Sequence, residues 1–152
     1  MKKLVKIVIL FLFFLPGLLV SCGKDNSTLK DGYYTAEEAE YNSNGWKEYL
    51  TIFVSGGQII LVEYNSFNPS GFLKSWDMDY MRHMNTTDGT YPNAYYRYYG
   101  HRLLERQGIE GIDALSGATE SYNAFVILAK AVLKNASVGN RSTTLVDTGD
   151  QL

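Results

Sequence analysis

Cysteine and histidine are scarce in this 152-residue chain, which contains one Cys, Cys22, and two His, His83 and His101. A single thiol cannot form a disulfide within the chain, and it cannot supply a thiolate cluster for zinc or for an iron–sulfur centre. We interpret both histidines as solvated surface residues, because a role as metal ligand or base needs more support than an isolated imidazole gives. We therefore expect no metal site.

The common catalytic motifs are also missing. The chain has no G-x-S-x-G nucleophile elbow, no H-E-x-x-H, no phosphate-binding G-x-x-x-x-G-K and no G-x-G-x-x-G. Basic residues are few as well: without Lys2, Lys3 and Lys6 of the leader, 11 basic residues face 16 acidic ones. We expect no catalytic residues, and nucleic acid is excluded as a partner because it requires clustered Lys and Arg.

The leader MKKLVKIVILFLFFLPGLLVSC combines a basic start, an apolar run from Ile7 to Val20 and a small residue before Cys22. This order is typical of a secretory signal. The run is shorter than the roughly 20 apolar residues that cross a bilayer, although a retained anchor is the alternative. The ending Leu-Val-Ser-Cys resembles a bacterial lipobox, which implies cleavage after residue 21 and a lipid on Cys22; secretion without a lipid remains open. We expect a tether over residues 22–30 and a protein anchored to the extracytoplasmic face of a bacterial membrane.

A β-hairpin is the clearest element of the mature chain. Around Gly56 and Gly57, two strand-like runs meet, and residues before the turn alternate between two faces. One face holds Trp46, Leu50, Ile52 and Val54, and the other holds Lys47, Tyr49, Thr51 and Phe53. A further strand is expected in DGYYTAE, from Asp31, and another in IEGIDAL, from Ile109.

Three helices are expected after the hairpin. The first contains Trp76, Tyr80 and Met84 on one stripe with Ser75 as its cap, and the second runs from Pro92 to Gly108. On the second helix Tyr95 and Tyr99 should face the sheet with Tyr96 and Arg97 outside, although the Tyr-rich run could also stack an aromatic ligand. The third spans about 121–133, and the tail over 135–152 should fray. The prediction is one α+β domain over 31–134, an antiparallel sheet with helices packed on it.

The stretch Ser116-Gly117-Ala118-Thr119 precedes the last expected helix. A helix start carries unpaired N–H groups and partial positive charge, which suits a phosphate. Gly117 permits a tight turn, Ala118 leaves space, and Thr119 offers a hydroxyl on a stiff side chain. The residues alone fit a phosphorylated ligand held at Thr119, but an ordinary helix cap is the simpler interpretation of them.

The longer stretch DALSGAT, from Asp113 to Thr119, resembles the Asp-x-x-Ser/Thr-Gly-Ala-Thr signature of the FMN-binding domain family. That family includes subunits of the sodium-pumping NADH:quinone oxidoreductase and Rnf complexes and flavinylated surface lipoproteins. The segments DGYYTAE, GWKEYLTIFVSGGQIILVEY and KSWDMDYMRHM extend the resemblance over about residues 31–133. It implies FMN joined through its phosphate to Thr119, with Asp113, Ser116, Gly117 and Ala118 completing the cofactor-binding motif, and a separate flavin transferase that installs it.

The resemblance implies an electron carrier, since the flavin supplies the redox chemistry and the protein supplies attachment and orientation. Its partners would be a membrane redox donor and an extracytoplasmic acceptor. Two alternatives remain open: a non-redox surface lipoprotein that acts as a binding or antigen-like module, and a flavin-dependent reductase with a specific substrate.

The lipid anchor predicts the behaviour of a Cys22→Ser protein. Serine cannot form the thioether, so the protein should either leave the membrane fraction or accumulate as the uncleaved precursor. Fractionation of cells followed by intact mass measures both. A mature Cys22→Ser protein that stays with the membranes would contradict lipidation at this residue.

Overall fold

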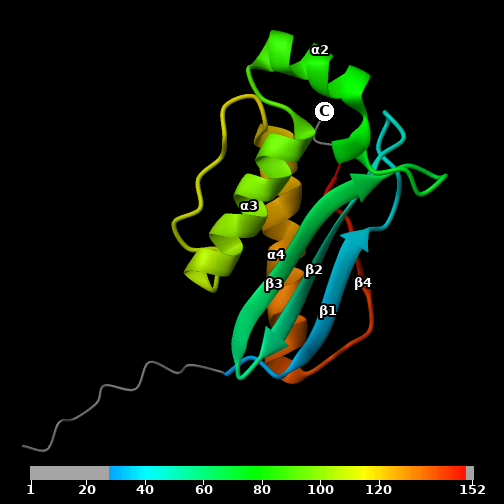
Figure 1. Ribbon diagram of the computed structural model, residues 1–152. Helices are drawn as coiled ribbons and strands as arrows, with labels where there is room; N and C mark the ends of the chain where they lie inside the picture. Colours follow the sequence, from blue (N-terminus) through cyan, green and yellow to red (C-terminus); the bar gives the residue numbers. More distant parts are fainter. Residues whose placement is uncertain (1–27, 150–152) are drawn as a thin grey trace, which may run out of the picture.

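The computed structural model describes residues 28–149, so the leader and Cys22 lie outside the described residues. The described chain forms one α+β domain in two layers, a sheet and two helices packed on one of its faces, with a further helix near one end of the sheet (Figure 1). The elements in chain order are β1 (Gly32–Glu38), β2 (Lys47–Ser55), β3 (Gln58–Phe67), the 3₁₀ turn η2 (Lys74–Trp76), α2 (Met78–Asp88), α3 (Pro92–Arg106), α4 (Thr119–Val138) and β4 (Thr144–Val146).

The sheet has the strand order β3-β2-β1-β4. Strands β1, β2 and β3 are antiparallel neighbours, as predicted, whereas β4 lies parallel to β1 and makes the sheet mixed. The parallel pair arises because the chain returns along α4 before it forms β4, so that the last strand runs in the same direction as β1.

The predicted alternation in β2 is confirmed. Leu50, Ile52 and Val54 are fully buried on the helix side of the sheet. The turn to β3 uses Gly56 and Gly57, whose φ angles of 60° and 76° are those of a two-residue hairpin turn that favours glycine.

Helices α3 and α4 cover the inner face of the sheet and bring an aromatic core onto it (Figure 1). Phe125 of α4 is fully buried and stacks on Tyr99 of α3, with ring centroids 5.2 Å apart. Tyr64 of β3 lies against both rings. These contacts fix α4 against α3 and the sheet, and therefore fix the position of its first residue, Thr119.

The first helix begins later than predicted. Asp77, and not Ser75, caps α2, because its carboxylate accepts from the amide of Tyr80 at 2.9 Å. Trp76 consequently lies in η2 and is 63% exposed, so its placement on one stripe of this helix was wrong. Met81 is the buried residue of α2.

Three other expectations are corrected. Tyr96 is buried, and only Arg97 of that pair is exposed. The run IEGIDAL is not a strand, since Gly111 in its middle has φ 71° and bends the chain. The described part of the tail does not fray either: α4 continues to Val138, and β4 pairs with β1.

Candidate functional site

The signature stretch lies where it was expected, at the start of the last helix. Thr119 is the first residue of α4, and Ala118 is the N-cap. The side chains of Asp113, Ser116 and Thr119 are exposed, whereas Ala118 is buried. The structure therefore presents the Thr119 hydroxyl to solvent at a helix N-terminus.

Gly117 has a structural role in addition to any role in binding. Its φ of 77° lies in the left-handed region, and a Cβ at this position would be 2.5 Å from the backbone oxygen of Asp88 and 3.2 Å from Cγ2 of Thr90. The connection between α2 and α3 thus packs directly on the signature loop. The absence of a side chain at Gly117 therefore leaves room for the backbone of Asp88.

The first turn of α4 has free backbone donors. The N-cap Ala118 has no side-chain acceptor, and within residues 28–149 no hydrogen bond is made by the amides of Thr119, Glu120 or Ser121. Such a start of a 20-residue helix suits an anion, through its N–H groups and its dipole. The acidic Glu120 in the same turn is the only charge in that turn and partly offsets this attraction.

Two tyrosine hydroxyls form hydrogen bonds with the backbone of the loop that precedes α4. The Tyr99 hydroxyl accepts from the amide of Leu115 at 3.0 Å and lies 3.3 Å from the carbonyl of Ala118. The Tyr122 hydroxyl donates to the carbonyl of Ile112 at 2.9 Å. The geometry around Thr119 is therefore set by the packed aromatic core.

A buried carboxylate, Glu48 of β2, lies beneath this helix start. It accepts from the Ser121 hydroxyl at 2.9 Å and from the Tyr96 hydroxyl at 3.2 Å, and it is also bonded to the Tyr64 hydroxyl. Tyr64 in turn lies 2.6 Å from the carbonyl of Ser121. We call Glu48, Tyr64, Tyr96 and Ser121 the Glu48 cluster; it joins β2, β3, α3 and α4.

Burial raises the pKa of the Glu48 carboxyl to about 7, and the neighbouring charge of Glu38 acts in the same direction. The hydroxyls of Tyr64 and Ser121 and the charge of the buried Lys74 oppose that rise. Burial and the Glu48 charge also raise the pKa of Tyr64 and of Tyr96, so both hydroxyls keep their protons and can donate. Glu48 was not predicted as a site residue, although its position on the apolar face of β2 was a visible signal.

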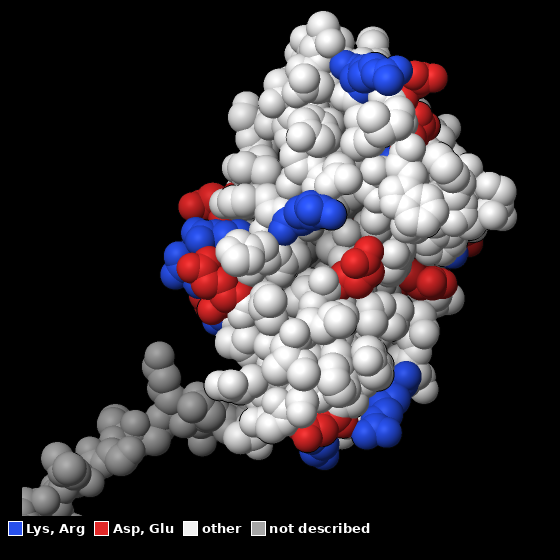
Figure 2. All heavy atoms as spheres, in the orientation of Figure 1, with Lys and Arg blue, Asp and Glu red and all other residues white. Residues whose placement is uncertain are grey.

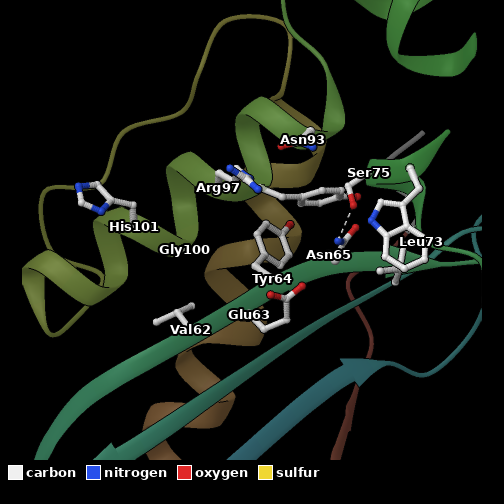
Figure 3. A pocket seen from close by; sticks show the side chains of 12 residues that line it. Val62, Glu63, Tyr64, Asn65, Leu73, Ser75, Asn93, Arg97, Gly100 and His101 are labelled. Carbon is white, nitrogen blue, oxygen red and sulfur yellow. Dashed lines mark hydrogen bonds between the residues drawn. The ribbon is translucent and has the colours of Figure 1, made fainter. Parts of the chain in front are cut away.

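A hollow with a volume of about 430 Å³ lies between β3, α3 and η2 (Figure 3). Arg97 and His101 of α3 line it together with Glu63 and Asn65 of β3, and Asn65 donates to Ser75 at 2.8 Å across it. None of the five signature residues lines this hollow. Of the tyrosines in the Tyr-rich run, only Tyr96 lines the hollow, and its side chain is buried. The run therefore forms no exposed platform in this hollow on which an aromatic ligand could stack.

The face viewed in Figure 2 interleaves acidic and basic side chains and has no broad basic patch. Both histidines are exposed. Among residues 28–149 no three His, Cys, Asp or Glu side chains are grouped to hold a metal ion. Within the same range no helix is both long and apolar enough to cross a bilayer.

Comparison with known proteins places the chain among lipoproteins. No protein-family model matches it. The 15 kDa lipoprotein of Treponema pallidum is 33% identical over 135 residues, which cover 89% of this chain and 94% of the relative. The chain belongs to the family of this lipoprotein. The match is longer than the described domain and includes part of the region before Thr28.

Two solved structures share the fold of this lipoprotein-family domain. A crystal structure of the CPE2226 protein from Clostridium perfringens has 42% sequence identity and a TM-score of 0.75, and the match covers 78% of this chain and 98% of that one. A solution structure of a Clostridium thermocellum protein has 26% identity and a TM-score of 0.50, with 71% and 92% covered.

The packing of Gly117 predicts a large effect of one methyl group. Gly117→Ala should lower the free energy of unfolding by at least about 2 kcal/mol, because it combines left-handed strain with overpacking against a backbone oxygen. Gly108→Ala is the matched control, since a Cβ there meets nothing within 4 Å. Urea unfolding of both variants measures the difference, and equal stabilities would contradict the close approach of Asp88.

The raised pKa of Glu48 predicts a pH dependence of stability. Between the ordinary glutamate pKa of 4.5 and the raised pKa of about 7, the folded protein holds a proton that the unfolded chain has released. The free energy of unfolding should therefore fall as pH rises through this window, by up to about 3 kcal/mol.

Glu48→Gln, which keeps the size but cannot ionise, should remove this fall. Urea unfolding at about pH 5 and about pH 8 measures it for the wild type, for Glu48→Gln and for the exposed control Glu63→Gln. The prediction fails if the wild type and Glu48→Gln lose equal stability between the two pH values.

Proposed function

We propose that this lipoprotein is an extracytoplasmic flavoprotein that carries FMN in phosphoester linkage on Thr119 and passes electrons at the membrane surface. One observation carries the proposal: Thr119 is exposed at the first position of α4, and the amides that follow it have no partner among residues 28–149. The resemblance of Asp113–Thr119 to the FMN-binding signature supports it.

Each residue of the site has a task in this proposal. Thr119 supplies the hydroxyl whose oxygen would attack the FMN phosphorus of an activated flavin nucleotide. The new O–P bond would replace the bond from that phosphorus to the nucleotide leaving group, which would take up the hydroxyl proton. The amides of Glu120 and Ser121 would donate to phosphate oxygens, with the dipole of α4 behind them. Gly117 and Ala118 keep side-chain bulk away from the attachment point, and Tyr99 holds the loop rigid. FMN, when bound, supplies the one- and two-electron redox chemistry.

The exposure of Thr119 also makes its hydroxyl accessible to a flavin transferase. A flavin transferase must bring its own active site to the acceptor hydroxyl, which requires a residue that is not covered by the fold. Thr119 meets this condition, and so does the neighbouring Ser116. After maturation, a membrane redox donor and an extracytoplasmic acceptor would exchange electrons with the flavin.

Membrane attachment through Cys22 is supported by the family. The Treponema pallidum relative is named a lipoprotein, and its similarity extends into the N-terminal region where the lipobox-like sequence lies. A lipid at Cys22 would confine the protein to the membrane surface, close to its redox donor.

A binding module without flavin is the second candidate, and the hollow of about 430 Å³ favours it. This hollow is lined by charged, polar and aromatic side chains and lies apart from the signature. In that case Gly117 would be explained by the packing of the α2–α3 connection alone.

The proposal is tested by Thr119→Val, which keeps the shape of the side chain and removes its hydroxyl. Because Ala118 and not Thr119 is the N-cap, the free energy of unfolding should change by no more than about 0.5 kcal/mol. Wild-type protein made together with a flavin transferase should give a fluorescent band in a denaturing gel, and the Val variant should give none.

Thr143→Val makes the same change at an exposed threonine outside the signature and serves as the matched control, which should stay fluorescent. Intact mass should show one FMN, less one water, on the wild type and on Thr143→Val, and none on Thr119→Val. A fluorescent Thr119→Val protein would move the attachment to Ser116 or Ser121. A wild type that stays unmodified beside an active transferase would leave the binding module as the function.

A further inference from the structure

The chain enters the domain at the end that is farthest along α4 from Thr119. Lys30 donates its amide to the carbonyl of Ala136 at 2.9 Å, and its ammonium lies 3.1 Å from the carbonyl of Val138. On the other side, a Cβ on Gly57 would be 3.7 Å from the carbonyl oxygen of Leu29. The segment through which the chain enters the domain, residues 28–30, therefore lies between the C-terminus of α4 and the β2–β3 turn (Figure 1).

The short segment between Cys22 and the domain limits how the domain can be oriented relative to the membrane. Only six residue steps separate Cys22 from Thr28, and a fully extended backbone covers at most about 20 Å over that distance. The 20 residues of α4 span about 30 Å in the opposite direction. With Cys22 acylated, the entry end must stay near the lipid, and the tether is too short to let the domain turn over freely.

The entry end also exposes an apolar row. Tyr33, Phe53 and Leu61 are register partners on β1, β2 and β3, on the sheet face that carries no helix. The rings of Tyr33 and Phe53 stack with centroids 4.3 Å apart, and Tyr33 and Leu61 are 58% and 44% exposed. Ile60, at the bulge beside Leu61, is 53% exposed.

Exposed cations flank this row at the same end. Lys30 lies at the C-terminus of α4, and Arg141 donates to the carbonyl of Asp31 at 2.9 Å. Tyrosine and aliphatic side chains beside Lys and Arg suit the headgroup layer of an anionic bilayer, where rings and apolar groups enter and cations stay at the phosphates.

We propose that the entry end of the domain rests on the bilayer through Tyr33, Phe53, Ile60 and Leu61, with Lys30 and Arg141 at the headgroups, so that Thr119 points away from the membrane. This contact adds a second attachment to the lipid anchor and presents the start of α4 to partners in the surrounding space. It rests on acylation of Cys22 and is independent of flavin.

The lipidated full-length protein allows a direct test, because acylated Cys22 leaves no other thiol in the chain. A single new cysteine, Ile60→Cys, is labelled with an environment-sensitive fluorophore in vesicles of phosphatidylethanolamine and phosphatidylglycerol. Lipids that carry a nitroxide near the headgroup should quench this label several-fold more than a label at Asn85→Cys, an exposed position on α2. Vesicles of phosphatidylcholine alone should reduce the difference.

A second variant separates the apolar row from the tether. Leu61→Ser in the Ile60→Cys protein should weaken the quenching by lipid while the protein still sediments with the vesicles. Equal quenching at residues 60 and 85, or quenching at 85 alone, would overturn the orientation. A label at residue 60 that is shielded from a soluble quencher but not quenched by lipid would mean that a protein covers the row, and would overturn the proposal as well.

Discussion

The carboxylate of Glu48 is the contact on which the arrangement of sheet and helices depends. A buried carboxyl group, protonated or ionised, is costly unless hydrogen bonds replace the lost water, and Tyr64, Tyr96 and Ser121 supply these bonds from three different elements. The requirement is mutual, because each hydroxyl is itself buried and needs a partner. One polar group thereby fixes the relative positions of β2, β3, α3 and the first turn of α4 more specifically than apolar packing would.

This arrangement explains why the start of α4 is well placed without a conventional cap. Ala118 contributes no side-chain acceptor, so the helix start is held from the inside, by Ser121 on Glu48 and by Tyr99 beneath the loop. The outer side of the first turn is thereby left with amides that have no partner in the described part of the chain, next to an exposed Thr119. A helix that was capped in the ordinary way would have consumed the donors that an anion needs.

Local patterns in the sequence predicted the elements that depend on local physics. The period of β2, the Gly56-Gly57 turn and the start of α4 were all foreseen, because alternation, turn geometry and small-residue signals act within a few positions. Trp76 was misplaced because a single cap bond from Asp77 delays α2. The partners of Glu48 could not be foreseen, since they come from residues 16 to 73 positions away, although a carboxylate in register with buried residues signals that partners must exist.

The segment after α4 also shows that local sequence patterns do not reveal long-range contacts. Its polar sequence predicted fraying, because the sequence does not show what lies beside it. In the structure, β4 pairs with the edge of β1, and Asn135 donates to Thr144 at 2.7 Å. The same turn brings Arg141 back to Asp31, next to the point where the chain enters the domain. The C-terminal segment thus closes the entry end of the fold, and Thr119 is exposed at the opposite end, where the end of α2 packs on the signature loop.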